Sequence, residues 1–294
     1  MSRTVIKLSG KVTDSPAVLA RVAQEIALGR KSGAEVIVVH GGGKQLDEMA
    51  SKLGLRCETV AGRRITDAAT LELAIQVFGG INARVSAALL GAGVEAVGVG
   101  GFAGRVITAT KRSPKLIVDG TESRLVDFGF VGDVADVRTD LLQGLLAGGF
   151  VPVVSSLGAD LSGQLLNINA DTIAAEIAAA IGAEVAVFVG DTDGILRDPK
   201  DSTTLIQRLS ISEARDLVQS GHASGGMLPK IAALAKFLEG SPSAAWPVQG
   251  GSESPAGVHA HLVNGLKQET ILAAFRGDVG VGTIVTRRHV EASH

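Results

Sequence analysis

The chain has 294 residues, of which 46% are hydrophobic, 38 are glycine and only 3% are aromatic. Its formal net charge is −2, so it is neither a disordered polyelectrolyte nor a basic protein built to bind nucleic acid. Cys57 is the single cysteine, which excludes an intrachain disulfide and a cysteine-rich zinc site. No run reaches about 18 uninterrupted apolar residues, and the start lacks the apolar core of a signal peptide. We therefore expect a cytoplasmic protein with no membrane span and no nucleic-acid partner.

The first half of the chain alternates short apolar strands with helices. Val5–Leu8 predicts a strand, Ser15-Pro16 predicts a capped helix start, and residues 35–39 predict a buried strand followed at once by glycines 41–43. Thr66-Asp67 caps a longer helix that extends to about residue 90. Its apolar side chains form one stripe at three- and four-residue steps, which indicates a core face or, in part, a subunit contact: Leu71, Ala74, Ile75, Phe78, Ile81, Val85 and Leu89.

The second half continues the alternation after a β-rich interval. Residues 104–132 predict hairpins, residues 151–155 a strand, and Asp171 opens an Ala-rich buried helix that ends at Gly182. Strands follow at residues 185–189, 261–263 and 283–285, and a Ser/Pro/Gly-rich loop spans residues 240–257. The alternation predicts an α/β fold, a three-layer αβα sandwich with a mostly parallel central sheet.

Some expected motifs are absent, or match a known pattern without the structural context that it requires. Residues 98–103 resemble a dinucleotide fingerprint, but the residues after them favour strand, whereas that motif requires a helix. The six histidines show no zinc-ligand spacing, and His40 beside the glycines is interpreted as a satisfied structural histidine.

Three glycine turns follow strands or open helices: residues 41–43, residues 191–194 and Gly225-Gly226. Glycine lets the backbone approach an anion, and a helix N-terminus presents N–H donors to it. Lys7 interrupts an apolar strand, and a charge there is costly unless it finds a counter-charge or opens into a site. Asp171 is the candidate partner, and Lys230 lies in the first turn of a helix, where a bound anion would offset the unfavourable dipole. The pattern indicates a phosphate-handling site.

The chain resembles the amino acid kinase family along nearly its whole length. The pieces that carry the resemblance are VIKLSG at 5–10, VHGGG at 39–43, GRRITD at 62–67, DFGFVGDV at 127–134, PVVSSLG at 152–158, NINAD at 167–171, GDTDGIL at 190–196 and SGGMLPK at 224–230.

The resemblance implies a role for each matching position. Lys7 and Lys230 would stabilise the transferring phosphoryl group, and Asp171 would hold both lysines. The acceptor would be bound by Gly42, Gly43, Arg64 and Asn167, with Arg64 on its α-carboxylate. ATP would be held by Gly10, Asp191, Thr192, Asp193, Gly194, Gly225 and Gly226. Mg²⁺ would be bound mainly through the phosphates, with no metal site made by the protein.

The reaction implied is ATP-dependent phosphorylation of the side-chain carboxylate of N-acetyl-L-glutamate. The alternatives are the same reaction on N-acetyl-2-aminoadipate, which is one methylene longer, and a catalytically silent amino-acid sensor of the same fold. Two lobes sharing one sheet are expected, residues 1–165 for acceptor binding and dimerisation and residues 166–288 for ATP, followed by a disordered tail at 289–294. Hexameric members of the family carry an extra N-terminal helix, which is missing here, so a homodimer joined through helix 67–90 is expected.

Overall fold

The computed structural model describes residues 2–60, 63–119, 122–198, 201–221, 227–240 and 257–287. An eight-stranded sheet forms its centre. Within the described chain, every neighbouring pair of this sheet is parallel except β17 with β18, which confirms the predicted mostly parallel sheet. In spatial order the strands are β16 (Arg208–Ser210), β18 (Thr283–Thr286), β17 (His259–Asn264), β13 (Val185–Gly190), β1 (Arg3–Leu8), β2 (Glu35–His40), β10 (Val151–Ser155) and β5 (Ala96–Gly100).

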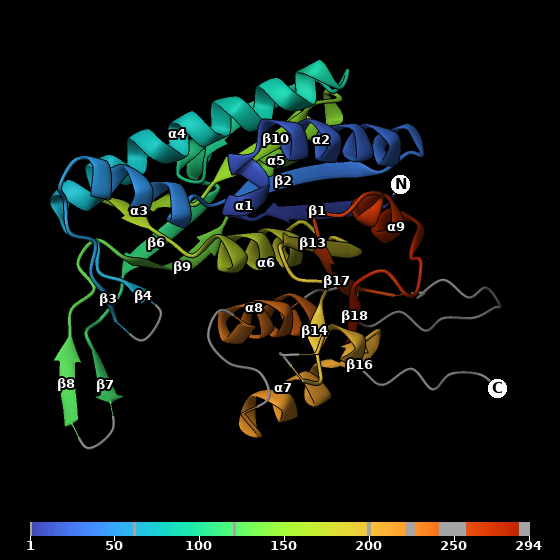
Figure 1. Cartoon of the computed structure of the whole chain (residues 1–294). Helices are drawn as coiled ribbons and strands as arrows, with labels where there is room; N and C mark the ends of the chain where they lie inside the picture. The colour runs from blue at the N-terminus through green and yellow to red at the C-terminus, as the bar shows by residue number, and fades with distance from the viewer. Residues whose placement is uncertain are drawn as a thin grey trace.

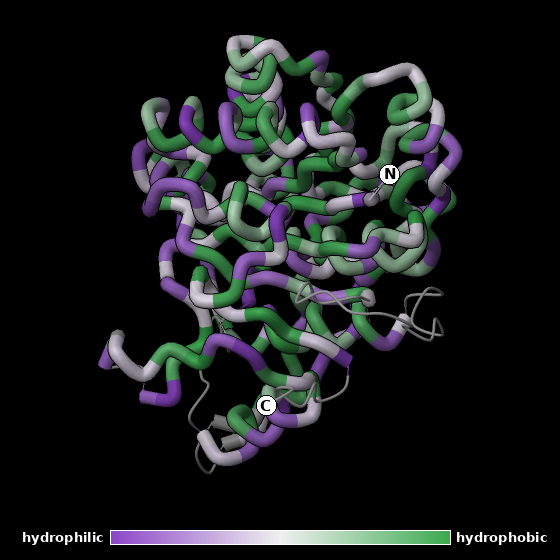
Figure 2. The backbone as a smooth tube through the Cα atoms, turned by 90° about the vertical axis from the view of Figure 1, so that its right-hand side faces the viewer, coloured by the Kyte–Doolittle hydropathy of each residue, from purple (hydrophilic) through white to green (hydrophobic). Residues whose placement is uncertain are grey.

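Helices cover both faces of this sheet, and α2, α3 and α4 lie on the opposite side from α6 and α8 (Figure 1). One core cluster joins the sheet to α1 (Gly10–Asp14), α2 (Pro16–Lys31), α3 (Gly43–Lys52), α4 (Ala68–Gly91) and α9 (Thr270–Arg276). The other joins it to α5 (Asp140–Ala147), α6 (Ala170–Ala180), α7 (Ile211–Gln219) and α8 (Met227–Gly240). The tube in Figure 2 shows the hydrophobic stretches that run through the middle of the molecule. The three-layer αβα architecture is therefore confirmed.

Smaller sheets flank the central one. The interval 104–132, predicted as hairpins, contains the β7–β8 hairpin, and β6 pairs antiparallel with β9. Four strands form a second sheet: β12 (Leu165–Asn167), β11 (Leu157–Ala159), β6 (Ile107–Lys111) and β9 (Gly132–Val137). Three strand pairs remain: β3 (Thr59–Val60) with β4 (Arg63–Arg64), β7 (Lys115–Asp119) with β8 (Glu122–Val126), and β14 (Ile195–Leu196) with β15 (Leu205–Ile206). Two short 3-10 turns, Ala103–Arg105 and Ser202–Thr204, and the strand pair β11–β12 were not predicted.

Helix α4 begins where its cap was predicted, because the Asp67 side chain accepts the backbone N–H of Thr70. Its apolar stripe, from Leu71 to Leu89, packs on the sheet, so the core interpretation of that stripe is confirmed. By length and composition α4 is apolar enough to cross a membrane, and 33% of its most apolar stretch is buried inside the described protein.

Three predictions fall on residues outside the described ranges: the loop at 240–257 apart from its two ends, the turn Gly225-Gly226 and the tail 289–294. The division into lobes at residue 165 stays a prediction.

Candidate functional site

The site lies where parallel strands end side by side. Strands β13, β1, β2 and β10 are neighbours with the same direction, so the segments that follow them meet at one edge of the sheet. These segments begin at Asp191, Ser9, Gly41 and Ser156. In an open α/β sheet this edge is the usual place for a ligand. The topology therefore brings the predicted turns 41–43 and 191–194 and the end of β1 together.

Lys7 and Asp171 form a buried ion pair at this edge. Side chains alternate along β1, and Lys7 shares the face of Val5, which packs in the core cluster on the α6 side. The Nζ atom of Lys7 lies 2.7 Å from Oδ1 of Asp171, and the two residues are 9% and 5% exposed. Asp171 stands in the first turn of α6, whose N-cap Asn169 accepts the backbone N–H groups of Asp171 and Thr172.

Lys230 reaches the same carboxylate from α8. Its Nζ lies 3.9 Å from Oδ2 of Asp171, and a quarter of its side chain is exposed. Burial alone would raise the pKa of Asp171, but the charges of Lys7 and Lys230 and the short contact with Lys7 outweigh burial and lower it. Asp171 is therefore an anion at neutral pH, placed between two cations. The three predicted catalytic side chains are thus brought together.

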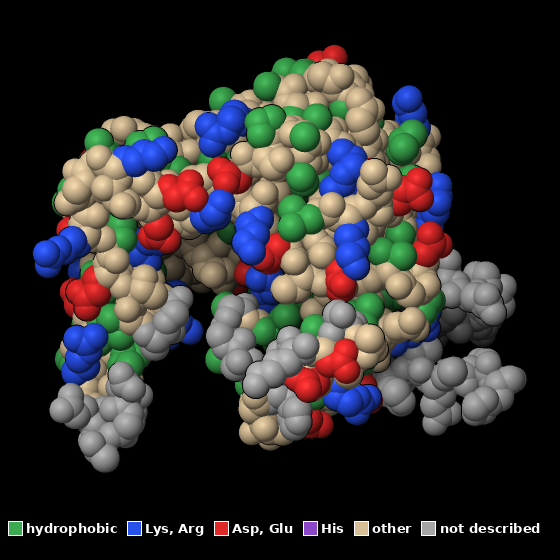
Figure 3. Space-filling view, in the orientation of Figure 1, with side chains coloured by type: hydrophobic (Ala, Val, Ile, Leu, Met, Phe, Trp, Pro, Cys, Tyr) green, Lys and Arg blue, Asp and Glu red, His purple; other side chains and the backbone are tan. Residues whose placement is uncertain are grey.

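A cavity of about 260 Å³ opens beside Lys7 and Asp171. Of the predicted residues, its lining includes Gly10, Gly42, Gly43, Arg64 and Asn167. This face of the molecule is hollowed between the β7–β8 hairpin and the α7–α8 region, with Lys and Arg side chains at the edge of the hollow (Figure 3).

Glycine is required at position 42 for a packing reason. A Cβ atom there would lie 2.5 Å from Ile81 Cδ1 and 2.7 Å from Phe78 Cδ1, both on α4. At Gly43, by contrast, the nearest atoms belong to the guanidinium of Arg64, 3.5 Å away. Gly42 thus lets the turn lie against α4, while Gly43 keeps the space in front of Arg64 open.

Arg64 presents part of its guanidinium to the cavity. Its Nη2 donates to the Gly43 carbonyl at 3.0 Å and to Asp47 at 2.5 Å, whereas its buried Nε has no hydrogen-bond partner among the described residues. Asn167 donates to the Thr66 hydroxyl at 3.2 Å. An arginine with a free buried donor is suited to a carboxylate ligand.

Two further arginines line the cavity and were not predicted from the sequence, Arg63 and Arg112. Arg112 is held by Asp133, to which its Nε donates at 3.0 Å. Arg63 stands in GRRITD, where the paired arginines at 63–64 were the available signal, whereas Arg112 lies outside the segments that carry the resemblance and its side chain contacts one of them through Asp133. Together with Arg64 they give the cavity a positive wall that suits an acceptor with two carboxylates.

The turn 191–194 lies next to this cavity, although its residues do not belong to the lining among the described residues. Asp191 pairs with Lys11, the residue after Gly10, and this contact lowers the pKa of Asp191. Asp193 accepts Asn264 Nδ2 and pairs with Lys267, both at 2.8 Å, while Thr192 is exposed. Gly194 has φ +146° and no space for a side chain, since a Cβ would lie 2.4 Å from Thr283 Oγ1. The ion pair between Lys11 and Asp191 therefore joins the segment that contains Gly10 to this turn. Gly225 and Gly226 lie outside the described residues.

His40 is a structural residue, as interpreted from the sequence. Its Nδ1 lies 2.9 Å from the Gly41 carbonyl, and its Nε2 lies 3.0 Å from Asn82 Nδ2. The carbonyl requires a donor and the amide N–H₂ an acceptor, which fixes the neutral ring with its proton on Nδ1. Burial, which the Gly41 bond only partly offsets, lowers the pKa of His40 to about 4.

The fold and the site are those of a class of proteins that bind anionic small molecules at the edge of a parallel sheet, next to lysine side chains. Residues 2–244 match the family model described as the amino acid kinase family, and the chain belongs to this family. It is 36% identical to the acetylglutamate kinase of Methanocella arvoryzae over 285 residues, which cover 96% of this chain and 89% of that protein. It is 42% identical to the acetylglutamate kinase of Sorangium cellulosum over 228 residues, 77% and 80% of the two chains.

Solved structures agree with the fold. The chain is similar to the N-acetylglutamate synthase of Neisseria gonorrhoeae, solved with coenzyme A and N-acetyl-glutamate, with TM-score 0.78 and 26% identity. That similarity covers 98% of this chain, which spans 60% of the synthase. The carbamate kinase of Giardia has TM-score 0.68 at 14% identity, over 98% and 99% of the two chains, and shows the shared fold alone.

Proposed function

We propose that this protein catalyses the ATP-dependent phosphorylation of the side-chain carboxylate of N-acetyl-L-glutamate. The products are N-acetyl-L-glutamyl 5-phosphate and ADP, and the reaction is the second step of arginine biosynthesis. The observation that carries the proposal is the placement of Lys7 and Lys230 around the buried carboxylate of Asp171, beside an arginine-lined cavity. The relatives named acetylglutamate kinase support the choice of acceptor.

The chemistry requires cations more than a general base. The acceptor carboxylate has a reference pKa of about 4.3, so it is already the nucleophile at neutral pH. One of its oxygens forms a bond to the γ-phosphorus of ATP while the bond from that phosphorus to the β–γ bridging oxygen breaks, and ADP leaves with the electron pair. Lys7 and Lys230 stabilise the negative charge on the transferring group, and Asp171 positions both lysines. This also argues against a silent sensor, which would have no use for two lysines aimed at one buried carboxylate.

Acceptor binding rests on one wall of the cavity. Arg64 binds the α-carboxylate with the donors that its contacts to Gly43 and Asp47 leave free. Asn167 and the backbone of Gly42 and Gly43 bind the rest of the acceptor. These roles place the side-chain carboxylate toward Lys7.

ATP is bound by Gly10, by residues 191–194 and by the Gly225-Gly226 turn. Mg²⁺ neutralises the phosphate charge and is bound mainly through the phosphates, as is usual for this ion in kinases. Two acidic side chains belong to the 191–194 turn itself, Asp191, which pairs with Lys11, and Asp193, which pairs with Lys267.

Hydroxylamine trapping tests the proposal. The acyl phosphate reacts with hydroxylamine to give a hydroxamate and inorganic phosphate, so the protein is assayed with ATP, Mg²⁺ and either N-acetyl-L-glutamate or N-acetyl-2-aminoadipate. The proposal predicts ATP-dependent hydroxamate from acetylglutamate with the higher kcat/KM. A higher kcat/KM for N-acetyl-2-aminoadipate would show that the protein catalyses the alternative reaction. No hydroxamate from either acid would refute the proposal that the protein is a kinase.

The enzyme works as a soluble cytoplasmic homodimer joined through α4. The core stripe of α4 is used within the chain, so the contact uses its opposite side, where Gly79, Ala83, Ala87 and Leu90 are exposed. Small side chains at these spacings let two helices approach closely. Light scattering on the wild type and on Ala83→Glu tests this: a dimer that becomes monomeric supports it, and a wild-type monomer refutes it.

A further inference from the structure

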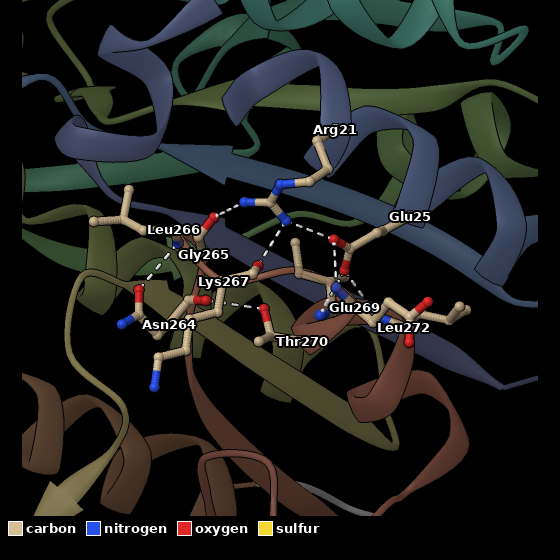
Figure 4. Close-up of polar contacts among 10 residues, drawn as sticks. Arg21, Glu25, Asn264, Gly265, Leu266, Lys267, Glu269, Thr270 and Leu272 are labelled. Carbon is tan, nitrogen blue, oxygen red and sulfur yellow. Dashed lines mark hydrogen bonds and ion pairs between the residues drawn. The ribbon is translucent and has the colours of Figure 1, made fainter. Parts of the chain in front are cut away.

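A buried carboxylate that does not line the cavity organises a second polar network. Glu25 lies on α2 and is 5% exposed, and α2 packs against α9 near the other end of the chain (Figure 4). Its Oε1 accepts the backbone N–H of Glu269 at 3.0 Å, and its Oε2 accepts those of Ile271 at 2.9 Å and Leu272 at 3.2 Å. One side chain from α2 therefore satisfies three backbone donors at the start of α9.

Glu25 replaces the cap that α9 itself lacks. The residue at the N-cap position, Glu269, has φ +60° and makes no side-chain cap hydrogen bond. The first N–H groups of a helix need acceptors, and a carboxylate there is favoured by the helix dipole. The position of α9 is thus set by a residue almost 250 positions earlier in the sequence.

Arg21, one turn before Glu25, holds the segment that leads into α9. Its Nη1 donates to Glu25 Oε1 and to the Lys267 carbonyl, both at 2.7 Å, and its Nη2 donates to the Gly265 carbonyl at 2.5 Å. Figure 4 shows this guanidinium between α2 and the loop that follows β17.

Residues 264–272 also contact residues 190–194, which are the last residue of β13 and the turn 191–194 that follows it. The Gly265 N–H donates to the Gly190 carbonyl at 2.9 Å. Asn264 Nδ2 donates to Asp193 Oδ1 at 2.8 Å, and Lys267 Nζ lies 2.8 Å from Asp193 Oδ2. Gly265 has no space for a side chain, since a Cβ there would lie 2.4 Å from Val189 Cγ1. The segment therefore contacts both the first residue of the turn and its second aspartate.

We infer that Arg21 and Glu25 are positioning residues for the nucleotide: they fix the 264–272 segment, which fixes the 190–194 turn in the conformation that binds ATP. This inference rests on the proposed function for the identity of the ligand at that turn. Arg21 and Glu25 touch neither the turn nor the cavity, so their effect passes through the segment. Their loss weakens ATP binding and leaves acceptor binding as it was, because Arg64 and Asn167 lie on other elements.

The test uses two substitutions on the same helix. Arg21→Ala removes the donors to Lys267 and Gly265. Arg30→Ala is the matched control, since Arg30 also lies on α2 and donates to a backbone carbonyl, that of Gly149, away from the turn. Arg21→Lys, which restores one cation, and Glu25→Gln serve as milder variants if Arg21→Ala does not fold.

Two readouts are taken from each purified full-length variant. The first is amide hydrogen exchange of peptides covering residues 189–196 and 264–272 without nucleotide, which does not depend on activity. The second is KM for ATP and for N-acetyl-L-glutamate. Arg21→Ala should speed exchange in both peptides and raise KM for ATP roughly tenfold, with KM for the acceptor unchanged, as the loss of charged hydrogen bonds implies. Arg21→Lys should recover part of the effect.

The inference is overturned if exchange in residues 189–196 or KM for ATP in Arg21→Ala matches Arg30→Ala. It is also overturned if both KM values rise together, which would indicate general loosening. A wild-type protein without ATP-dependent hydroxamate formation would instead refute the proposed function, and the exchange of residues 189–196 would still report whether Arg21 holds the turn.

Discussion

Lys230 should matter far more to turnover than to stability. Its Nζ lies 3.9 Å from Asp171 and a quarter of its side chain is exposed, whereas Lys7 makes the closer, buried contact at 2.7 Å and remains when Lys230 is replaced. We therefore expect Lys230→Met to lower the free energy of unfolding by no more than about 1 kcal/mol, as for a partly exposed ion pair. Turnover should fall about 100-fold or more, because losing one stabiliser of transition-state charge costs about 2.7–4 kcal/mol.

Lys236→Met is the matched control. Lys236 lies on the same helix and also pairs with a carboxylate of α6, that of Glu176 at 3.3 Å, but outside the site. ADP release at saturating substrates measures turnover, and urea denaturation measures the free energy of unfolding. The reasoning is refuted if Lys230→Met turns over like Lys236→Met, or if its loss of turnover is matched by a loss of folded protein.

Three further predictions concern other side chains. Lys7→Met should lower the free energy of unfolding by about 3 kcal/mol or more, because it leaves the buried carboxylate of Asp171 with only the longer contact to Lys230; urea denaturation no different from wild type would contradict this. Arg64→Lys should raise KM for acetylglutamate about tenfold, because an ammonium lacks the planar fork that binds a carboxylate, and steady-state kinetics would expose an unchanged KM. Acidification should destabilise the protein through His40, whose folded pKa of about 4 lies below its ordinary value of 6.5. The unfolded chain takes up this proton first, so between pH 8 and pH 5 the free energy of unfolding should fall by about 2 kcal/mol from His40 alone. A His40→Gln variant with an equally steep pH dependence would show that another group is responsible.

Much of the site could be predicted from local sequence. A lysine in an otherwise apolar strand needs a counter-charge, and an aspartate in the first turn of a buried helix is a natural one. The ion pair between Lys7 and Asp171 is what that argument requires. The helix starts at Ser15 and Asp67 could be predicted for a similar reason, because a cap is a signal carried by a few adjacent residues.

Features that depend on distant partners could not be predicted. Helix α9 has no cap in its own sequence, and its donors are satisfied by Glu25 on α2. Arg112 enters the cavity because β6 and β9 pair, which places it beside Asp133. The packing of Gly42 against Ile81 and Phe78 of α4 was not predicted either, although a side chain at position 42 would have no space there. In each case the deciding contact joins residues whose proximity only the fold creates.

The transfer of phosphate to the side-chain carboxylate is tested most directly with an isotope. N-acetyl-L-glutamate carrying ¹⁸O in both oxygens of that carboxylate is incubated with the protein, ATP, Mg²⁺ and hydroxylamine. Attack of the carboxylate on the γ-phosphorus makes one labelled oxygen the bridge of the acyl phosphate, and hydroxylamine then breaks the bond between that oxygen and carbon. We predict that the released inorganic phosphate contains one ¹⁸O atom per molecule. Phosphate without ¹⁸O would show that the carboxylate is not the phosphoryl acceptor and would contradict the proposed function.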